Sequence, residues 1–137
     1  MKEITLKAEL TRLDEVIEFL NKELEAENCS MFTILQMDIA VEELFVNIAN
    51  YAYDPEEGAV TIQVVFEDDM VHVIFIDSGK PYNPWEKKDP DTTLNAEERT
   101  VGGLGIYMVK KSMNYVDYSY EDGKNILTIK KNIREDV

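Results

Sequence analysis

The chain has very little cysteine, histidine or positive charge. It contains one cysteine, Cys29, and one histidine, His72, among its 137 residues. A single cysteine cannot form an internal disulfide, and neither residue has partners at the spacing of metal ligands. These shortages argue against a disulfide-stabilised domain or a zinc site. They favour a reducing, cytoplasmic setting, and they predict that His72 is a residue of a strand surface.

Basic residues are half as frequent as acidic ones, 14 against 28, which gives a formal net charge of −14. Such a surface repels nucleic-acid phosphates and anionic lipids, so neither is an expected partner. Any nucleotide would have to be held by local features such as a metal ion, helix N-termini and backbone N–H groups. A basic protein partner, by contrast, would be attracted.

Long apolar runs are also missing. No stretch reaches the roughly 18 apolar residues of a membrane span, and the N-terminal MKEITLKAEL lacks the apolar core of a signal peptide. Hydrophobic residues make up 45% of the chain and charged residues 31%. Residues 1–137 are therefore expected to form a single domain that is large enough for its own core.

Hydrophobic periodicity predicts the secondary structure. The expected elements are a strand over 2–9, a helix from a cap at Thr11 to about Glu27, a helix from a cap at Ser30 to near Tyr53, strands over 59–67 and 70–77, a helix opening at the glycines of 102–105, and a hairpin of 116–121 and 125–131. Short turns between strands favour antiparallel pairing. The prediction is an α+β two-layer sandwich, a mixed but mostly antiparallel sheet covered on one face by three helices, in the order β-α-α-β-β-lid-α-β-β.

Residues 78–101 break this pattern. Three prolines interrupt the segment, and only a short helical piece around 95–99 is expected within it. Irregular segments longer than about 12–15 residues are uncommon in compact domains and often cover a binding site. The segment is therefore a candidate lid.

The second predicted helix carries one narrow polar strip along an otherwise apolar surface. The strip contains Gln36, Ala40, Glu43, Asn47, Asn50 and Asp54, and the apolar remainder, expected to be buried, contains Ile34, Leu35, Ile39, Val41, Leu44, Phe45, Ile48 and Ala49. Glu43 and Asn47 are four residues apart, so they share a helix face and can meet one small ligand. The alternative is an ordinary solvated face.

Glycines follow at two points where a ligand could approach the backbone. Asp77-Ser78-Gly79 ends a predicted buried strand, and Gly102-Gly103-Leu104-Gly105 opens a helix. Glycines at a helix start let backbone N–H groups come close to phosphates. Alone, this second run is a weak signal, because the spacings of the dinucleotide-binding and P-loop motifs are absent.

Together these segments resemble the motifs of the histidine-kinase-like (GHKL, or Bergerat-fold) ATPases, and specifically the anti-sigma-factor serine/threonine kinase branch. AVEELFVNIANYAY is similar to the family's N-box, IDSGKPYNP to its first glycine box and GGLGIYMVKK to its second. ILTIKK is similar to its last sheet strand, and the resemblance covers nearly the whole chain. It implies the Bergerat ATP-binding fold with ATP and Mg²⁺ as cofactors.

The resemblance also implies roles for individual residues. Asn47 would hold Mg²⁺, Asp77 would accept a hydrogen bond from the adenine amino group, and Gly79 would permit the turn beneath the base. Further cofactor-binding residues are expected to be Asn50, Arg99 as a γ-phosphate contact, Gly103, Leu104 and Gly105, and Thr128 near the adenine. Glu43 would be the catalytic base that takes the proton from a substrate serine hydroxyl. The alternative for Glu43 is a carboxylate that is only solvated or that orders water.

Three departures from the family pattern leave catalysis open. Tyr51 stands where the family often has His, Pro81 stands where it often has Gly, and the basic residue nearest before the second glycine box is Arg99.

The implied function is a protein serine kinase that phosphorylates an antagonist of the STAS (anti-anti-sigma) type and sequesters a sigma factor by partner switching. A homodimer is compatible with this. One alternative is a non-catalytic ATP-binding module that acts by protein–protein binding only. Another is an acidic domain that binds no nucleotide.

Overall fold

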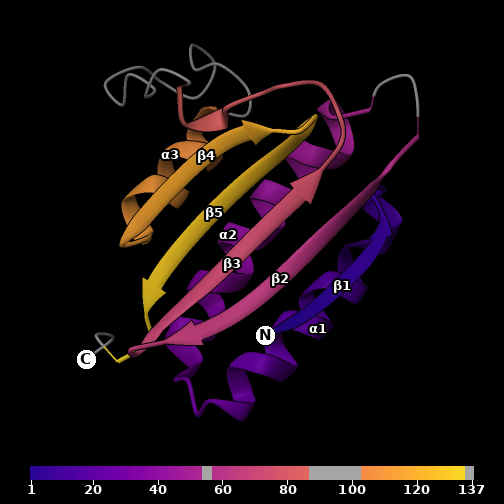
Figure 1. Ribbon diagram of the computed structural model, residues 1–137. Helices are drawn as coiled ribbons and strands as arrows, with labels where there is room; N and C mark the ends of the chain where they lie inside the picture. The colour runs from indigo at the N-terminus through magenta and orange to yellow at the C-terminus, as the bar shows by residue number, and fades with distance from the viewer. Residues whose placement is uncertain (54–56, 87–102, 135–137) are drawn as a thin grey trace.

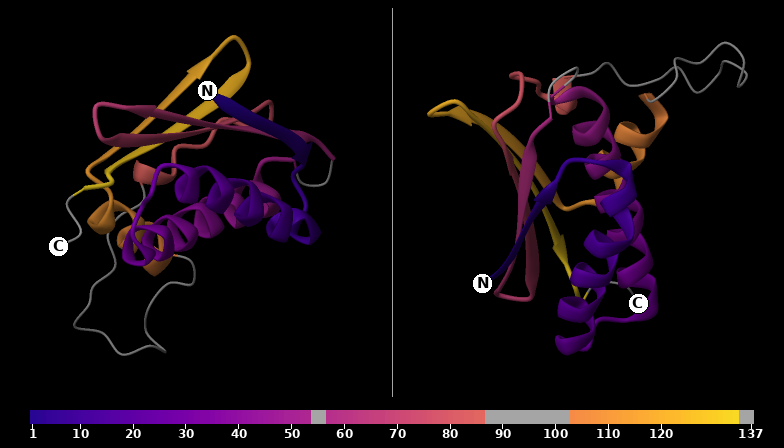
Figure 2. Two further views of the ribbon diagram at one scale, coloured as in Figure 1. Left: turned by 90° about the horizontal axis from the view of Figure 1, so that it is seen from below. Right: turned by 90° about the vertical axis from the view of Figure 1, so that its right-hand side faces the viewer.

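Five strands form one sheet, and three α-helices lie together against one of its faces (Figures 1 and 2). This computed structural model describes residues 1–53, 57–86 and 103–134. The elements are β1 (Lys2–Lys7), a 3-10 helix η1 (Leu10–Arg12), α1 (Leu13–Ala26), α2 (Met31–Tyr51), β2 (Ala59–Glu67), β3 (Met70–Asp77), a 3-10 helix η2 (Pro84–Glu86), α3 (Gly103–Ser112), β4 (Tyr115–Glu121) and β5 (Lys124–Asn132). The predicted two-layer α+β fold and its element order are confirmed.

The strands are ordered β1-β2-β3-β5-β4, so β3 is central. All four pairings between these described strands are antiparallel, and the parallel pair that a mixed sheet would contain is not among them. Two tight turns account for the hairpins, because Asp68 and Asp69 have φ of 50° and 64°, and Asp122 and Gly123 have φ of 53° and 76°. Two consecutive residues with positive φ are typical of the turns that match the twist of a hairpin.

The core lies between the sheet and the helices. Val71, Val73 and Phe75 of β3 are buried, and their alternation along the strand places them on the face toward α2. Asp77 continues the same alternation, so its carboxylate also lies on the helix side at the end of the strand. On β5 the buried residues are Asn125, Leu127 and Ile129. The sheet thus directs Asp77 and Asn125 to the same corner of the core.

The helix caps agree only in part with the prediction. Ser30 caps α2 as expected, because its Oγ accepts a hydrogen bond from Thr33 N at 3.1 Å. Thr11 does not cap α1. It lies inside η1, and α1 begins after Arg12 without a side-chain cap. A 3-10 turn often precedes an α-helix and can satisfy its first amides, which the periodic pattern alone does not reveal.

The expectation that α2 is buried apart from one polar strip is wrong at two positions. Leu35 is 53% exposed and Ile39 is 63% exposed, although both are large apolar residues. α1 and α3 lie on either side of α2 and the sheet lies on a third side, so none of the described elements covers the outward face of α2 (Figure 2). Periodicity identifies apolar residues but does not show how much of a helix surface its neighbours cover.

The first part of the predicted lid is attached to the sheet. Within residues 78–86, Pro84–Glu86 form η2, and the indole Nε1 of Trp85 donates to the carbonyl of Asp117 on β4 at 2.8 Å. The structured turn corrects the expectation that this part of the segment is irregular. Asp54, the short helix expected at 95–99 and the rest of the lid lie outside the described residues.

None of the helices in the described ranges combines the length and apolar character that crossing a bilayer requires.

The Ser30 cap generates a stability prediction. Replacing Ser30 with Ala removes the acceptor for Thr33 N, and we expect a loss of about 1 kcal/mol in the free energy of unfolding, measured by urea denaturation. Ser30→Asp restores an acceptor and should remain near the wild-type value. Equal stability of the Ala variant and the wild type would show that the cap contributes nothing.

Candidate functional site

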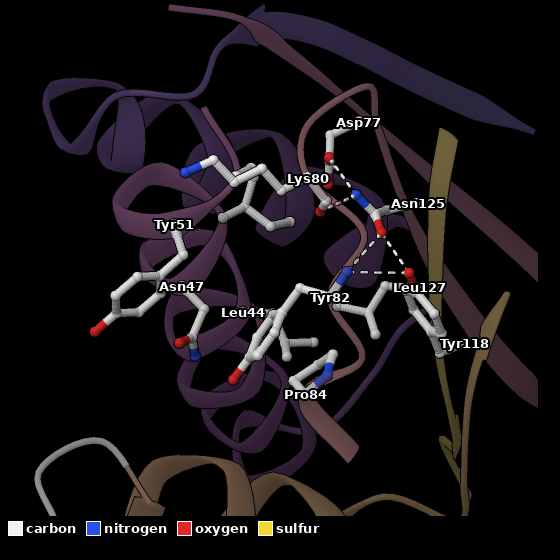
Figure 3. A pocket seen from close by; sticks show the side chains of 12 residues that line it. Leu44, Asn47, Tyr51, Asp77, Lys80, Tyr82, Pro84, Tyr118, Asn125 and Leu127 are labelled. Carbon is white, nitrogen blue, oxygen red and sulfur yellow. Dashed lines mark hydrogen bonds between the residues drawn. The ribbon is translucent and has the colours of Figure 1, made fainter. Parts of the chain in front are cut away.

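A pocket of about 390 Å³ empty volume lies between the C-terminal half of α2 and the ends of β3, β4 and β5 (Figure 3). Its lining residues are Leu44, Asn47, Ile48, Tyr51, Ala52, Asp77, Lys80, Tyr82, Pro84, Tyr118, Asn125 and Leu127. Aliphatic and aromatic side chains form most of the wall, and a few polar groups converge on it. This composition, an apolar wall with a few converging polar groups, is typical of small-molecule sites.

Asp77 is the buried acceptor at one end of the pocket. Its side chain is 6% exposed, and Oδ1 accepts hydrogen bonds from Gly79 N and from Asn125 Nδ2, both at 2.9 Å. Among the described residues, no hydrogen bond reaches the other oxygen, Oδ2. The carboxylate is thus held by one oxygen, and the other remains an acceptor for a ligand that donates a hydrogen bond.

Asn125 connects Asp77 to the loop and to β4. Its Nδ2 also donates to the Lys80 carbonyl at 2.9 Å, while its Oδ1 accepts hydrogen bonds from Tyr82 N at 3.2 Å and from the Tyr118 hydroxyl (Figure 3). Burial raises the pKa of Tyr118, which favours the neutral donor that this arrangement needs. The amide nitrogen and the amide oxygen of Asn125 both have hydrogen-bond partners. Burying this amide therefore leaves no unsatisfied polar group, and the network is rigid.

Asn125 was not predicted as a site residue, because no motif in the sequence includes it. The feature that identifies Asn125 is the sheet register, which places it directly opposite Asp77 across β3 and β5.

Gly79 allows the loop after β3 to approach the end of α2. A Cβ at this position would lie 2.3 Å from the backbone carbonyl oxygen of Ala52, and Lys80 N donates to that same oxygen at 2.9 Å. Because the obstructing atom belongs to the backbone, no side-chain rotation could relieve the overlap. Only glycine permits this contact, which closes the pocket beside Asp77.

Tyr53 fixes the same corner from the other side. Its hydroxyl donates to the Ala59 carbonyl and accepts from Ser78 N, both at 2.7 Å. Burial raises the pKa of Tyr53, so the hydroxyl stays protonated and can make both bonds. The end of α2, the start of β2 and the residue after Asp77 are thereby joined through one side chain.

Glu43 and Asn47 meet at the start of α3. Asn47 Nδ2 donates to the Glu43 carbonyl at 3.0 Å and lies 3.4 Å from Glu43 Oε1. A Cβ on Gly105 would lie 2.1 Å from the carboxyl carbon of Glu43, so the side chain rests directly against the first turn of α3. Gly103 and Leu104 open this helix, whose first backbone N–H groups have no partner within the helix. The structure therefore brings a carboxylate, an amide and a helix N-terminus together.

The residues here fit a magnesium ion that is held mainly by a nucleotide. The Asn47 amide nitrogen donates within α2, and among the described residues no hydrogen bond reaches its Oδ1. A carbonyl-type oxygen is a suitable Mg²⁺ ligand. In the described part of the chain, no group of three or more His, Cys, Asp or Glu residues could hold a metal ion. Most ligands would therefore come from phosphates and water.

Two tyrosine rings stand at the wall of the pocket. The ring centroids of Tyr51 and Tyr82 are 6.5 Å apart, with the planes inclined by 51° (Figure 3). Tyr51 is 58% exposed and Tyr82 is 42% exposed, so their faces can contact an entering ligand. No role was predicted for Tyr82, because its position depends on how the loop folds back onto Asn125.

Asn47 and Asp77 are the predicted site residues found in the described lining of this pocket. Glu43, Gly79 and the glycines at the start of α3 lie outside that lining, and three further predicted residues are placed elsewhere or not described. Thr128 lies between the buried residues Leu127 and Ile129, and its side chain is on the opposite face of the sheet, where it pairs with Ile74. Asn50 is exposed and does not line the pocket. Arg99 lies outside the described residues.

Comparisons with known proteins agree with this geometry. The model of the histidine kinase-like ATPase domain family matches residues 6–131. Serine-protein kinase RsbW of Listeria monocytogenes is 28% identical over 102 residues, covering 71% of this chain and 65% of the relative. RsbW of Bacillus cereus (strain ATCC 10987) is 29% identical over 108 residues, covering 76% and 68%. The chain thus spans about two thirds of the length of these curated relatives.

Solved structures are similar in fold. The catalytic domain of histidine kinase ThkA, in a nucleotide-free form, aligns with a TM-score of 0.55 at 12% identity and covers 97% of this chain and 98% of that one. The histidine kinase AdeS of Acinetobacter baumannii gives the same TM-score and identity, with 98% and 70% covered.

The Asp77–Asn125 network generates a prediction about the free energy of unfolding. Replacing Asn125 with Ala leaves the Lys80 carbonyl without this donor and the Tyr118 hydroxyl without its acceptor, and we expect a loss of about 1–3 kcal/mol in the free energy of unfolding. Thr128→Ala is the matched control on the same strand, and its effect should stay within about 0.5 kcal/mol. Urea denaturation of both variants checks this. A larger loss for the Thr128 variant would contradict the described register.

Proposed function

The chain belongs to the histidine kinase-like ATPase domain family, and we propose from this that it binds ATP with Mg²⁺ in the pocket beside Asp77 and transfers the γ-phosphoryl group to a protein serine. The observation that supports nucleotide binding is the Asp77 carboxylate, whose Oδ1 accepts two hydrogen bonds while its Oδ2 accepts none from the described residues. A fixed acceptor favours a base that offers an N–H donor. Adenine offers its exocyclic amino group there, whereas guanine offers a carbonyl oxygen.

The remaining wall suits a purine ring. Leu44, Ile48 and Leu127 provide aliphatic contacts, and Tyr51 and Tyr82 add aromatic faces. From this end the phosphates would run toward Asn47 and the first turn of α3, where the backbone N–H groups and the helix dipole favour negative charge. These local features must outweigh the repulsion from a chain with a net charge of −14.

Asn47 Oδ1 is the protein group that would hold Mg²⁺ in this arrangement. When bound, the ion would neutralise negative charge on the phosphates during phosphoryl transfer. Asn47 orients this assembly because its own amide nitrogen is anchored to the Glu43 carbonyl.

Glu43 is the proposed general base. Its carboxylate lies one helical turn from Asn47 and against Gly105, close to where phosphates would bind. A substrate serine hydroxyl that approaches the γ-phosphate there can give its proton to a Glu43 carboxylate oxygen as its own oxygen attacks phosphorus. Without this base the same pocket would serve a non-catalytic, ATP-dependent binding module.

The biological setting is part of the proposal. The relatives named serine-protein kinase RsbW support the protein serine kinase activity. The motif resemblance extends the proposal to a STAS-type antagonist as the substrate in the cytoplasm, and to a sigma factor that the chain sequesters when that antagonist is phosphorylated.

The role of Asn47 is tested by calorimetry. Asn47→Ala removes the proposed metal ligand, and we expect ATP affinity to fall by at least about tenfold with Mg²⁺ present, down to the level seen with EDTA. Asn50→Ala is the matched control on the same helix but outside the pocket, and it should bind ATP as the wild type does. Unchanged Mg²⁺-dependent affinity in the Asn47 variant would remove its assigned role.

The role of Glu43 is tested by Glu43→Gln, which keeps the size of the side chain beside Gly105. ATP binding should persist, while transfer of radiolabelled phosphate to a STAS-domain antagonist should fall by roughly 10²–10⁴-fold, since a base is lost. Glu67→Gln, at the exposed end of β2, should transfer at the normal rate. Normal transfer by the Glu43 variant would show that another group accepts the proton.

A further inference from the structure

The N-terminal half of α2 exposes a row of large apolar side chains, here called the apolar stripe. Met31 is 69% exposed, Phe32 57%, Leu35 53% and Ile39 63%. Residues three, four and seven apart share a helix face, so Phe32, Leu35 and Ile39 form one continuous row. A contiguous exposed row of this kind, unlike scattered single residues, marks an interaction site.

An acidic groove adjoins the apolar stripe. It runs between α1 and α2, and its lining residues are Leu13, Asp14, Ile17, Glu18, Asn21, Lys22, Glu25 and Glu42. Glu42 lies three residues after Ile39, so the stripe leads directly to the edge of the groove. Leu13 and Ile17 are half-buried and give the groove an apolar floor. Four carboxylates surround that floor, with Lys22 as the opposing charge.

Asp38 adds to the negative character of this region. Burial raises the pKa of Asp38, a hydrogen bond from the Asn21 amide lowers it, and the nearby charge of Glu42 raises it. A carboxylate that is partly desolvated and faces another carboxylate would gain from a cation placed between them. The region is therefore complementary to positive charge as well as to apolar surface.

We propose that the apolar stripe and the acidic groove together bind a basic amphipathic helix of a partner protein. Its apolar side chains would lie on Leu35 and Ile39, and its Lys or Arg side chains would face Glu18 and Glu42. An amphipathic helix in a groove is a common mode of recognition, and acidic rims both steer and select a basic partner. This surface does not include the pocket beside Asp77, so the inference does not depend on the proposed kinase activity.

A second copy of the chain fits this surface less well. A symmetric contact would place the stripe and its acidic borders against the same stripe and the same borders. Like charges brought together in this way cost several kcal/mol. With a net charge of −14, the chain also has few cations elsewhere to offer.

The test uses the full chain and a fluorescein-labelled peptide of about 18 residues, five helical turns, with leucine on one face and lysine on the other. A scrambled peptide of the same composition controls for plain charge attraction. Fluorescence anisotropy at about 0.15 M salt screens distant charges. We expect the amphipathic peptide to bind at least about tenfold tighter than the scrambled one. Equal affinities, or no binding, would overturn the proposal.

Substitutions test whether the peptide binds at the apolar stripe and the acidic groove. Leu35→Ser/Ile39→Ser changes only exposed side chains and should abolish the preference for the amphipathic peptide. Glu18→Lys/Glu42→Lys should weaken its binding by about tenfold, whereas Glu3→Lys/Glu67→Lys, the matched pair on the sheet, should weaken it by less than about threefold. Equal losses in both charge-reversed pairs would mean non-specific attraction and overturn the proposal.

Two further measurements test whether the double variant is folded and whether a second copy of the chain occupies the surface. ATP binding by Leu35→Ser/Ile39→Ser should equal that of the wild type, which shows that the variant is folded and keeps the two proposals independent. Analytical ultracentrifugation tests the second copy as occupant. A wild-type dimer that these two substitutions dissociate would overturn the proposal in favour of self-association.

Discussion

The hydrogen bond between Asp77 and Asn125 is the interaction on which the site depends. It joins the ends of two neighbouring strands at 2.9 Å, and the same amide nitrogen also fixes the Lys80 carbonyl. Without it, a buried carboxylate would have one backbone donor and no defined direction. The sheet thus acts as more than a support for α2, because its central pairing determines which oxygen faces the pocket.

The helix α2 provides the rest of the site and also the surface proposed for a partner. Its C-terminal half contributes Asn47 and Tyr51 to the pocket, while its N-terminal half exposes Leu35 and Ile39. The strong apolar character of this helix therefore has two causes. Residues toward the sheet form the core, and those on the outer face remain available for contact with another protein.

Much of this arrangement could be predicted from the sequence, because it depends on local spacing. Glu43 and Asn47 lie on one helix face as their four-residue separation requires, and Asp77 follows the alternation of a buried strand. Thr128 could not be placed in the same way. Which residue of β5 stands opposite Asp77 depends on a register set after a long connection, and a shift of one residue changes the face.

Other features of the structure could not be predicted from the sequence, because they depend on which elements cover a given surface. Nothing local distinguishes Leu35 from the buried apolar residues around it, because its exposure follows from how three helices are arranged on one sheet. Tyr82 reaches the pocket because the loop after β3 folds back onto Asn125, and Tyr118 is placed there by the pairing of β4 with β5. The cap at Ser30, which requires only a side chain three residues before an amide, was predicted and confirmed.

Gly79 and Gly105 differ in what confines them, and this has a functional consequence. Gly79 meets backbone atoms of Ala52, so a larger residue there would disturb the fold itself. Gly105 meets only the end of the Glu43 side chain, which can rotate away. Alanine at that position would leave the architecture intact and displace the carboxylate. Under the role proposed for Glu43, a single methyl group at this position would lower phosphoryl transfer by moving the general base, without changing the backbone that frames the pocket.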